Sequence, residues 1–171
     1  LDVTNRDGVQ TARLGLAKLE KTMINFYLDE MGVSQSEFGF PVTRHETNYL
    51  NANIEMARAG VFKNNIILSG WMRAIPEDAK VAFKLTKIEN LNLSISTSEQ
   101  MLKGKFLGKR TRDDIIRVMT EAVKLARQKG AKLIGVNAED ASRTDMEFLI
   151  KFSLAAKEAG ADRIRYCDTL G

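Results

Sequence analysis

The sequence is poor in the residues that build disulfides and histidine-rich metal sites, with one cysteine, Cys167, and one histidine, His45. A single cysteine excludes a framework of internal disulfides and is typical of a reducing compartment. No apolar run approaches the roughly 18 residues of a membrane-spanning helix, and no signal-peptide pattern opens the chain. We therefore expect a cytoplasmic protein without a membrane partner.

No charge of one sign dominates: 26 Lys and Arg residues face 22 Asp and Glu residues, for a net charge of +4. Cations concentrate in residues 103–112, but this stretch contains only one aromatic residue, Phe106. Nucleic-acid binding usually needs a broader basic face with stacking aromatics, so we expect no nucleic-acid partner. The stretch is either a solvated loop or a site for a small anionic ligand, such as the phosphates of a nucleotide-like cofactor.

Apolar spacing alternates between helical and strand-like along the chain, as expected for one globular domain or part of a larger one. Helices are predicted over residues 14–30, 45–59, 76–84, 111–129 and 145–158. Strands are predicted at the start of the chain and over residues 33–40, 65–70, 91–95, 133–136 and 163–167. This order favours parallel βα units.

Two folds of parallel βα units compete, an open doubly wound sheet and a (β/α)8 barrel. No Gly-x-Gly-x-x-Gly follows the first predicted strand, which counts against the dinucleotide-binding open sheet. The spacing of the units suits a barrel of about 250 residues. We predict an α/β fold, an incomplete (β/α)8 TIM barrel with strands 1–6 present and strands 7–8 missing, in which residues 1–171 are the N-terminal part of the catalytic domain.

Every predicted strand ends in a segment that carries polar residues. These segments are Arg6-Asp7, Glu37, Trp71-Met72-Arg73, Ser96-Thr97-Ser98, Asn137 to Asp140, and Asp168-Thr169. Chemistry collects at the C-terminal strand ends of a barrel, so we expect these residues to share one site. The Asp7 carboxylate can hold a divalent metal and the Arg6 guanidinium can stabilise an oxyanion, although Arg-Asp-Gly alone is also a common solvated turn.

Several of these residues form ordered motifs. The motifs are Asp2-x-Thr4-x-Arg6-Asp7-Gly8-x-Gln10, Glu37-x-Gly39-Phe40-Pro41, Ser96-Thr97-Ser98, Glu139-Asp140-x-x-Arg143 and Asp168-Thr169-x-Gly171. Together they resemble the acetyl-CoA-dependent 2-oxo acid condensing enzymes among the DRE-type TIM-barrel metallolyases, which carry an HMGL-like domain. These are the isopropylmalate, homocitrate and Re-citrate synthases, and the motifs look most like those of the Re-citrate type.

The resemblance implies roles for individual residues. Asp7 matches a metal ligand, for Mn²⁺, Mg²⁺ or Zn²⁺, and Arg6 matches a catalytic arginine. Gln10 would lie near the substrate, while Glu139, which we also take as catalytic, and Thr169 would contact the 2-oxo acid. The remaining substrate-binding candidates are Glu37, Arg73, Thr97 and Arg143.

The two candidate arginines, Arg73 and Arg143, favour a dicarboxylic substrate, oxaloacetate or 2-oxoglutarate, because a guanidinium binds carboxylate bidentately. The alternative is that either arginine pairs with a neighbour such as Asp140 or Asp145. The implied activity is an acyltransferase reaction, a metal-assisted Claisen condensation of acetyl-CoA with the 2-oxo acid. An aldolase or lyase of the same superfamily, or a non-catalytic truncated subunit, is the competing interpretation.

One departure from the family is large. Its other metal ligands are two histidines of a His-x-His-Asn-Asp segment on strand seven, whereas His45 here precedes a predicted helix and suits a solvated or capping role. We therefore expect a fragment or one half of a split enzyme, inactive as an isolated chain. We expect it to form a homo-oligomer or to pair with a chain that supplies strands 7–8.

Overall fold

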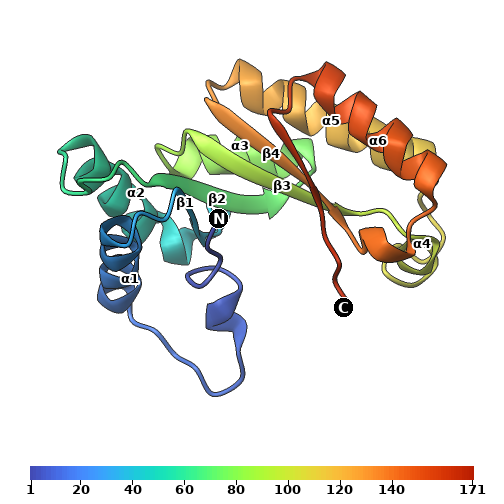
Figure 1. Ribbon diagram of the computed structural model, residues 1–171. Coiled ribbons are helices and arrows are strands. Elements are labelled where there is room, and N and C mark those ends of the chain that lie inside the picture. Colours follow the sequence, from blue (N-terminus) through green and yellow to red (C-terminus); the bar gives the residue numbers. More distant parts are fainter. The chain divides into compact units, whose positions relative to one another are not determined.

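The computed structural model describes residues 1–171 as an α/β chain (Figure 1). The strands are β1 (Gln35–Gly39), β2 (Ile67–Arg73), β3 (Asn90–Ser96), β4 (Leu133–Glu139) and β5 (Arg163–Tyr166). The helices are α1 (Lys18–Glu30), α2 (Arg44–Arg58), α3 (Pro76–Leu85), α4 (Glu99–Gly104), α5 (Arg112–Gln128) and α6 (Met146–Ala159), with 3₁₀ turns at Gly8–Gln10 and Ala141–Arg143. The five strands follow chain order in the sheet, and β1–β2 and β4–β5 are parallel, which confirms the predicted βα units.

The first predicted strand is wrong as a strand. Asp2 makes only an isolated parallel bridge to Ser36 of β1, and the sheet has five strands rather than six. The chain turns immediately afterwards, because the backbone amides of Arg6, Asp7 and Gly8 all donate to the carbonyl of Val3, at 3.1, 2.8 and 3.2 Å. The segment still lies beside β1, where an initial barrel strand would lie.

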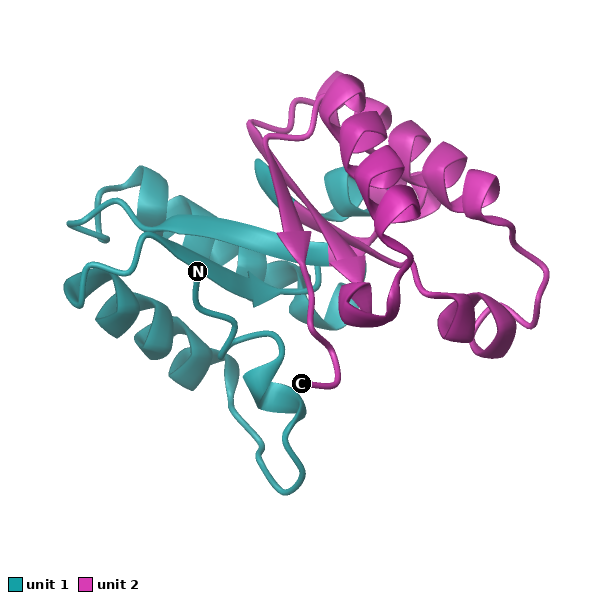
Figure 2. Ribbon diagram, turned by 45° about the vertical axis from the view of Figure 1, so that its right-hand side comes forward, with its two compact units in different colours: residues 1–71, 81–91 teal, residues 72–80, 92–171 magenta.

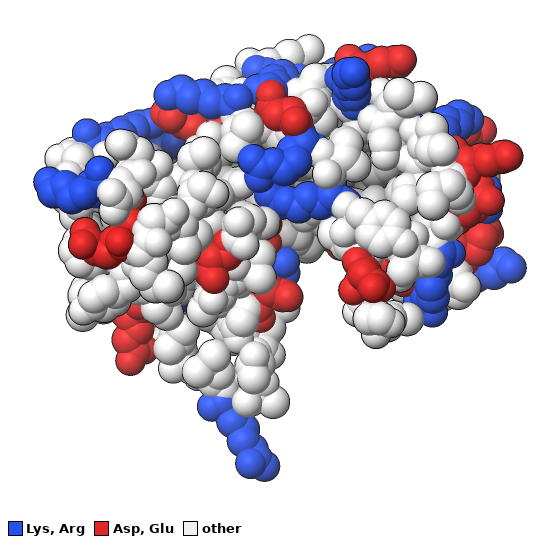
Figure 3. All heavy atoms as spheres, in the orientation of Figure 1, with Lys and Arg blue, Asp and Glu red and all other residues white.

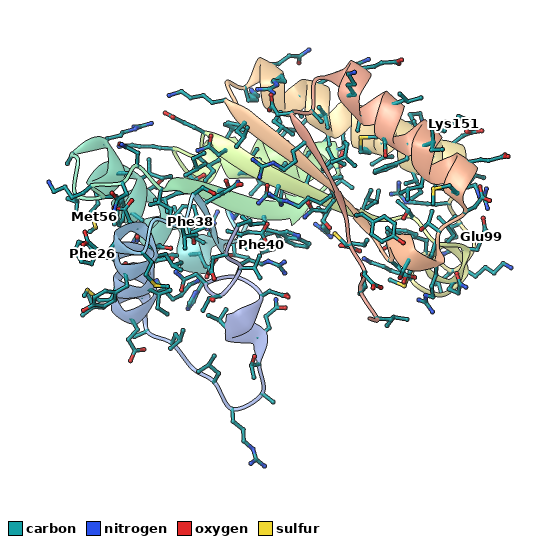
Figure 4. All side chains as sticks on the ribbon, in the orientation of Figure 1. Phe26, Phe38, Phe40, Met56, Glu99 and Lys151 are labelled. Atoms are coloured by element: carbon teal, nitrogen blue, oxygen red, sulfur yellow. The ribbon has the colours of Figure 1, made fainter.

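The chain forms two compact units (Figure 2), residues 1–71 with 81–91 and residues 72–80 with 92–171. In the first unit, α1 and α2 pack on β1, and the core includes the buried side chains of Phe38, Tyr49 and Leu50. The rings of Phe38 and Tyr49 lie 5.8 Å apart between centroids, and Figure 4 labels Phe38 within this unit.

Strand β1 contains an irregularity at the point where the site begins. Its register with β2 shifts between Glu37, which pairs with Ser69, and Gly39, which pairs with Gly70. A Cβ at Gly39 would lie 2.6 Å from the Glu46 carboxylate. Only glycine therefore lets Glu46 reach the backbone amide of Phe40, from which it accepts a hydrogen bond at 2.6 Å.

In the second unit, α5 and α6 run side by side against β4 and β5 (Figure 1). The core contains fully buried apolar side chains from both helices and from β4, among them Met119, Val123, Ile134, Val136 and Phe152. This is the expected result of apolar residues at helical spacing facing a near-continuously apolar strand.

The predicted helices are confirmed, with small shifts at their ends. At the start of α5 the Thr111 hydroxyl accepts from the Asp114 amide, and the Asp114 carboxylate accepts from the Thr111 amide in return, which forms a capping box. Helix α6 ends at Gly160, whose φ of 106° suits glycine. The first helix begins at Lys18 rather than at residue 14.

One helix was not predicted. Helix α4 begins after Ser98, whose hydroxyl accepts from the Met101 amide at 3.2 Å and so caps the helix. The basic stretch from residue 103 to 112 therefore starts inside a short helix, rather than being a loop throughout. None of the helices combines the length and the apolar composition that a membrane-spanning helix needs.

Candidate active site

The first group of site residues lies in the first unit and is fixed by a buried network of amides. The Asn5 side-chain amide donates to the Asn25 side-chain carbonyl and to the Lys21 backbone carbonyl, each at 2.8 Å. Asn25 also accepts from the Ser36 hydroxyl at 2.9 Å and donates to Asn53 at 3.0 Å. Asn5 and Asn25 are completely buried, so this network sets the position of the residue that follows Asn5, Arg6.

The Arg6 guanidinium is held on three sides. Its Nε donates to the Glu37 carboxylate at 2.8 Å, and Glu37 is only 1% exposed. Its Nη1 donates to the Asp7 carboxylate at 2.9 Å, and its carbon lies 4.9 Å from the centre of the Trp71 ring. Nη2 makes no hydrogen bond within the chain. The free edge of an oriented guanidinium is the arrangement that an oxyanion needs.

A cavity of about 280 Å³ lies beside this arginine, within the first unit. Arg6 and Gln10 provide polar lining, and Phe40 and Trp71, with ring centroids 5.5 Å apart, provide an aromatic wall. Figure 4 labels Phe40, the residue that follows β1. The structure thus brings together Arg6, Gln10 and Glu37, three residues that the sequence analysis selected from different segments.

The second group of site residues gathers at the end of β4, in the second unit. The Glu139 carboxylate accepts from the hydroxyls of Ser94 and Ser96, at 2.8 and 2.6 Å, and from the Lys105 ammonium at 2.9 Å. Burial alone would raise the pKa of Glu139, but the bonds from Ser96 and Lys105 outweigh burial and lower its pKa below the usual value. Glu139 is therefore a carboxylate at neutral pH.

The next residue, Asp140, organises the turn after β4. Its backbone is left-handed, with φ of 60°, and its amide donates to the Thr169 hydroxyl at 3.0 Å. Its carboxylate receives a two-pronged contact from Arg143, at 2.8 and 2.6 Å, and a short hydrogen bond from Ser98. The bonds from Arg143 lower the pKa of the Asp140 carboxyl, and Asp140 in turn raises the pKa of Arg143.

Thr97 joins the same cluster, since its hydroxyl donates to the backbone carbonyl of Glu139 at 3.0 Å and lies 2.7 Å from the hydroxyl of Thr144. The structure therefore brings Thr97, Glu139, Arg143 and Thr169 together. Of the two pairings considered for Arg143, it is the one with Asp140 that forms.

Arg73 lies at the end of β2 and binds Asp78 of the following helix, α3. It therefore joins neither the Arg6 group nor the Glu139 group of site residues. Its guanidinium donates to both oxygens of the buried Asp78 carboxylate, at 2.9 and 2.7 Å, and Asp78 raises the pKa of Arg73. Both arginines that were candidates for a distal substrate carboxylate thus already bind an aspartate.

Two residues of the site were not selected from sequence. Lys105 lay in the basic stretch, but nothing in the sequence linked it to Glu139, 34 residues away. Asn25 lies on a helix face, and only the fold shows that it joins several partners from other segments.

The residues of this chain do not form a metal site by themselves. The chain contains no group of three or more His, Cys, Asp or Glu side chains arranged to hold an ion. Asp7, at 58% side-chain exposure, offers one carboxylate, and His45 is exposed at the start of α2. Asp7 is therefore the one candidate ligand in this chain whose side chain suits a divalent cation.

The fold and the two groups of strand-end residues define an α/β protein of parallel βα units with its polar chemistry at the carboxyl ends of its strands. The HMGL-like family model matches residues 1–171, and the chain belongs to this family.

Similar proteins agree with this assignment. The chain is 63% identical over 172 residues to the Citrate (Re)-synthase of Dehalococcoides mccartyi (strain CBDB1), covering 100% of the chain and 41% of that protein. It is 43% identical over 171 residues to 2-isopropylmalate synthase 2 of Caldanaerobacter subterraneus, covering 100% of the chain and 42% of that protein. The chain spans about two fifths of the length of the curated relatives that it matches.

A solved structure supports the fold. The hydroxymethylglutaryl-CoA lyase of Pseudomonas aeruginosa superposes with a TM-score of 0.77 at 14% identity, covering 100% of this chain and 57% of that one.

Proposed function

We propose that residues 1–171 form the N-terminal part of a TIM-barrel catalytic domain that condenses acetyl-CoA with a 2-oxo acid. The family assignment and the 63% identity to a Citrate (Re)-synthase support this activity, and they favour oxaloacetate over 2-oxoglutarate as the acceptor. The complete enzyme is this chain together with the segment that completes the barrel, whether in the same chain or in a complementing one.

The observation that carries the proposal is the geometry of Arg6. Removal of a methyl proton from acetyl-CoA places negative charge on the thioester oxygen of the enolate, and attack on the ketone moves that charge to the former keto oxygen. Arg6 is oriented by Glu37, Asp7 and Trp71 and has a free Nη2 beside a cavity. A cation fixed before the reaction stabilises such a charge without the cost of reorganisation.

The Glu139 cluster serves substrate binding in this proposal. Ser94, Ser96 and Lys105 hold its carboxylate in one orientation as an anion. An anionic carboxylate only accepts hydrogen bonds, so it selects a hydroxyl or another donor on the bound molecule. Thr97 and Thr169 contribute hydroxyl groups in the same turn region.

A divalent cation bound at Asp7 would polarise the keto carbonyl of the 2-oxo acid. The chain's own contribution is to present Asp7 in a fixed place, because Arg6 bonds one of its carboxylate oxygens at 2.9 Å.

Substrate-dependent release of coenzyme A from the complete enzyme tests the proposal. Acetyl-CoA is supplied with oxaloacetate, 2-oxoglutarate or pyruvate, and the free thiol is measured. We expect release with one 2-oxo acid, oxaloacetate, and little with the others. Cleavage of a hydroxy acid to an oxo acid without any thiol release would show a lyase instead, and no turnover with any acceptor would show a non-catalytic subunit.

A further inference from the structure

Lys21 is the only buried lysine or arginine of the chain, at 5% exposure. The other cations are exposed or partly exposed, and Figure 3 shows cations interspersed with anions on the face that it displays. Removing a charged group from water is costly unless an opposite charge and hydrogen bonds compensate it. The surroundings of Lys21 therefore indicate what its charge contributes.

Lys21 lies on α1, and its ammonium reaches two residues of α2. Its Nζ donates to the Glu46 carboxylate at 2.6 Å and lies 4.5 Å from the centre of the Tyr49 ring, which adds a cation–π contact. Well-packed apolar side chains of similar volume commonly stabilise a fold as well as a buried ion pair does. What the ion pair adds is that it fixes the direction of one carboxylate.

Glu46 uses its second oxygen to hold the chain at the end of β1. Its Oε2 accepts from the backbone amide of Phe40 at 2.6 Å, while its Oε1 meets Lys21. Gly39 leaves room for this approach, since a Cβ there would lie 2.6 Å from Oε2. Hydrogen bonds to an ionised acceptor are stronger than those between neutral groups. Lys21 and Glu46 together therefore hold the backbone next to the point where the register of β1 shifts.

The residue that Glu46 holds, Phe40, forms part of the aromatic wall of the cavity of about 280 Å³. Its ring lies 5.5 Å from the Trp71 ring, which in turn lies 4.9 Å from the guanidinium carbon of Arg6. A chain of contacts within the first unit thus links the buried lysine to the guanidinium. Its members, in order, are Lys21, Glu46, Phe40, Trp71 and Arg6.

A second link joins Lys21 to Arg6 through the buried amide network. The backbone carbonyl of Lys21 accepts from the side-chain amide of Asn5 at 2.8 Å, and Asn5 immediately precedes Arg6. Asn5 is completely buried, so this bond is part of what places the following residue. One residue of α1 is therefore joined to both supports of the guanidinium, the amide network before it and the aromatic wall beside it.

We propose that Lys21 and Glu46 are a positioning pair that fixes the aromatic wall and thereby holds the Arg6 guanidinium in its reactive orientation. The inference rests on the proposed function, in which Arg6 stabilises a developing oxyanion. It assigns a role to two residues that act through other side chains rather than on the reacting atoms. Such a pair affects turnover more than substrate binding, because a misplaced oxyanion donor loses an interaction that is made in the transition state.

The test is steady-state release of coenzyme A by the complete enzyme that carries Lys21→Met, with circular dichroism to verify folding. Methionine keeps much of the apolar packing of the lysine side chain but leaves Glu46 without its cation. We expect kcat to fall by at least about tenfold, since a small misplacement of a catalytic group can cost about a hundredfold. The KM values for acetyl-CoA and for the 2-oxo acid are expected to stay within about twofold of those of the unaltered enzyme.

A spectroscopic signal reports on the aromatic wall without any reaction. The complete enzyme is labelled with fluorotryptophan, and the fluorine NMR resonance of Trp71 is assigned by its absence in Trp71→Phe. We expect this resonance to shift in Lys21→Met, because the wall that packs against the Trp71 ring is no longer held.

Asp29→Ala is the matched control for a general loss of stability. Asp29 is a buried carboxylate on the same helix, at 1% exposure, and accepts from the backbone amides of Asn64 and Ile66, each at 2.9 Å. Neither of these two partners lines the cavity. The control variant is expected to have a lower melting temperature but an unchanged kcat and an unchanged Trp71 resonance.

The outcomes separate this inference from the proposed function. Retention of kcat within about twofold in Lys21→Met overturns the inference, as does a fall in kcat without a shift of the Trp71 resonance or an equal fall in Asp29→Ala. Glu46→Asp, whose shorter side chain does not span Lys21 and Phe40 together, replaces Lys21→Met if that variant misfolds, with the same expected results. If the resonance shifts as expected but the unaltered enzyme releases no thiol with any 2-oxo acid, the positioning pair stands and the proposed function fails.

Discussion

Replacement of Arg6 by alanine in the complete enzyme is the perturbation with the clearest calculable effect. The change removes the only side chain that joins Glu37, Asp7 and Trp71 around the cavity. Loss of one preorganised oxyanion donor costs about 2.7–4 kcal/mol of transition-state stabilisation, so kcat falls by about 10²–10³. Steady-state release of coenzyme A at saturating substrates measures this fall.

The same substitution has a second, separable effect on stability. It removes a cation that pairs with Glu37, a carboxylate that is 1% exposed, so the variant is expected to be less stable than the unaltered enzyme. The kinetic assay is therefore run well below the melting temperature and normalised to folded protein. In a double-mutant cycle with Glu37→Gln, two groups in contact are expected to show a coupling energy of about 0.5–3 kcal/mol.

A matched control distinguishes the specific effect of losing Arg6 from the general effect of losing an ion pair. Arg58 pairs with Glu89 at 2.6 Å in the same unit, but both side chains are substantially exposed. Arg58→Ala is expected to leave kcat unchanged and to alter stability by at most about 1 kcal/mol. If Arg6→Ala retained kcat within about threefold of the unaltered enzyme, the reasoning from oxyanion stabilisation would be refuted.

Three further predictions concern the residues around the site. Asn25→Ala leaves several buried hydrogen-bond partners unsatisfied, at about 1–3 kcal/mol each, and should lower the melting temperature markedly. Replacement of the exposed Asn48 by alanine is the control and should leave the melting temperature unchanged. Equal melting temperatures for the two variants would contradict the role of the Asn25 network. A backbone N–H at the start of α5 lowers the pKa of Asp114 to about 2. The stability that this gives is complete above the usual pKa of an aspartate and is lost as the pH falls towards the lowered value. Unfolding curves of Asp114→Asn should lack this acid-dependent component, and an identical acid response would exclude it. Glu139→Gln should reduce kcat/KM for the 2-oxo acid by about tenfold or more, with a smaller loss for Lys105→Ala, and unchanged kinetics in both would remove the cluster from the site.

The features that sequence predicts well here are local ones. The α5 capping box needs only Thr111 and Asp114, three residues apart, and the buried face of α5 follows from apolar spacing within one helix. The strand order and the parallel pairing follow from the alternation of elements, because βα units allow few other arrangements.

The features that sequence missed depend on contacts between distant residues or on competing local signals. The sequence predicts that Arg6 and Glu37 share a site, but not that they form an ion pair across 31 residues, and it gives no link between Lys105 and Glu139 across 34. The sequence predicts strand-end chemistry for Ser98, whereas in the structure its hydroxyl also caps α4 and donates to Asp140. The apparent first strand failed because three amides converge on the Val3 carbonyl and turn the chain at once.

The contact between Arg6 and the reacting oxygen is the central prediction, and a crystal structure of the complete enzyme with its 2-oxo acid bound tests it most directly. We predict that Arg6 Nη2 lies about 2.7–3.2 Å from the keto oxygen. A bound 2-oxo acid whose keto oxygen lies away from the Arg6 guanidinium would contradict the account.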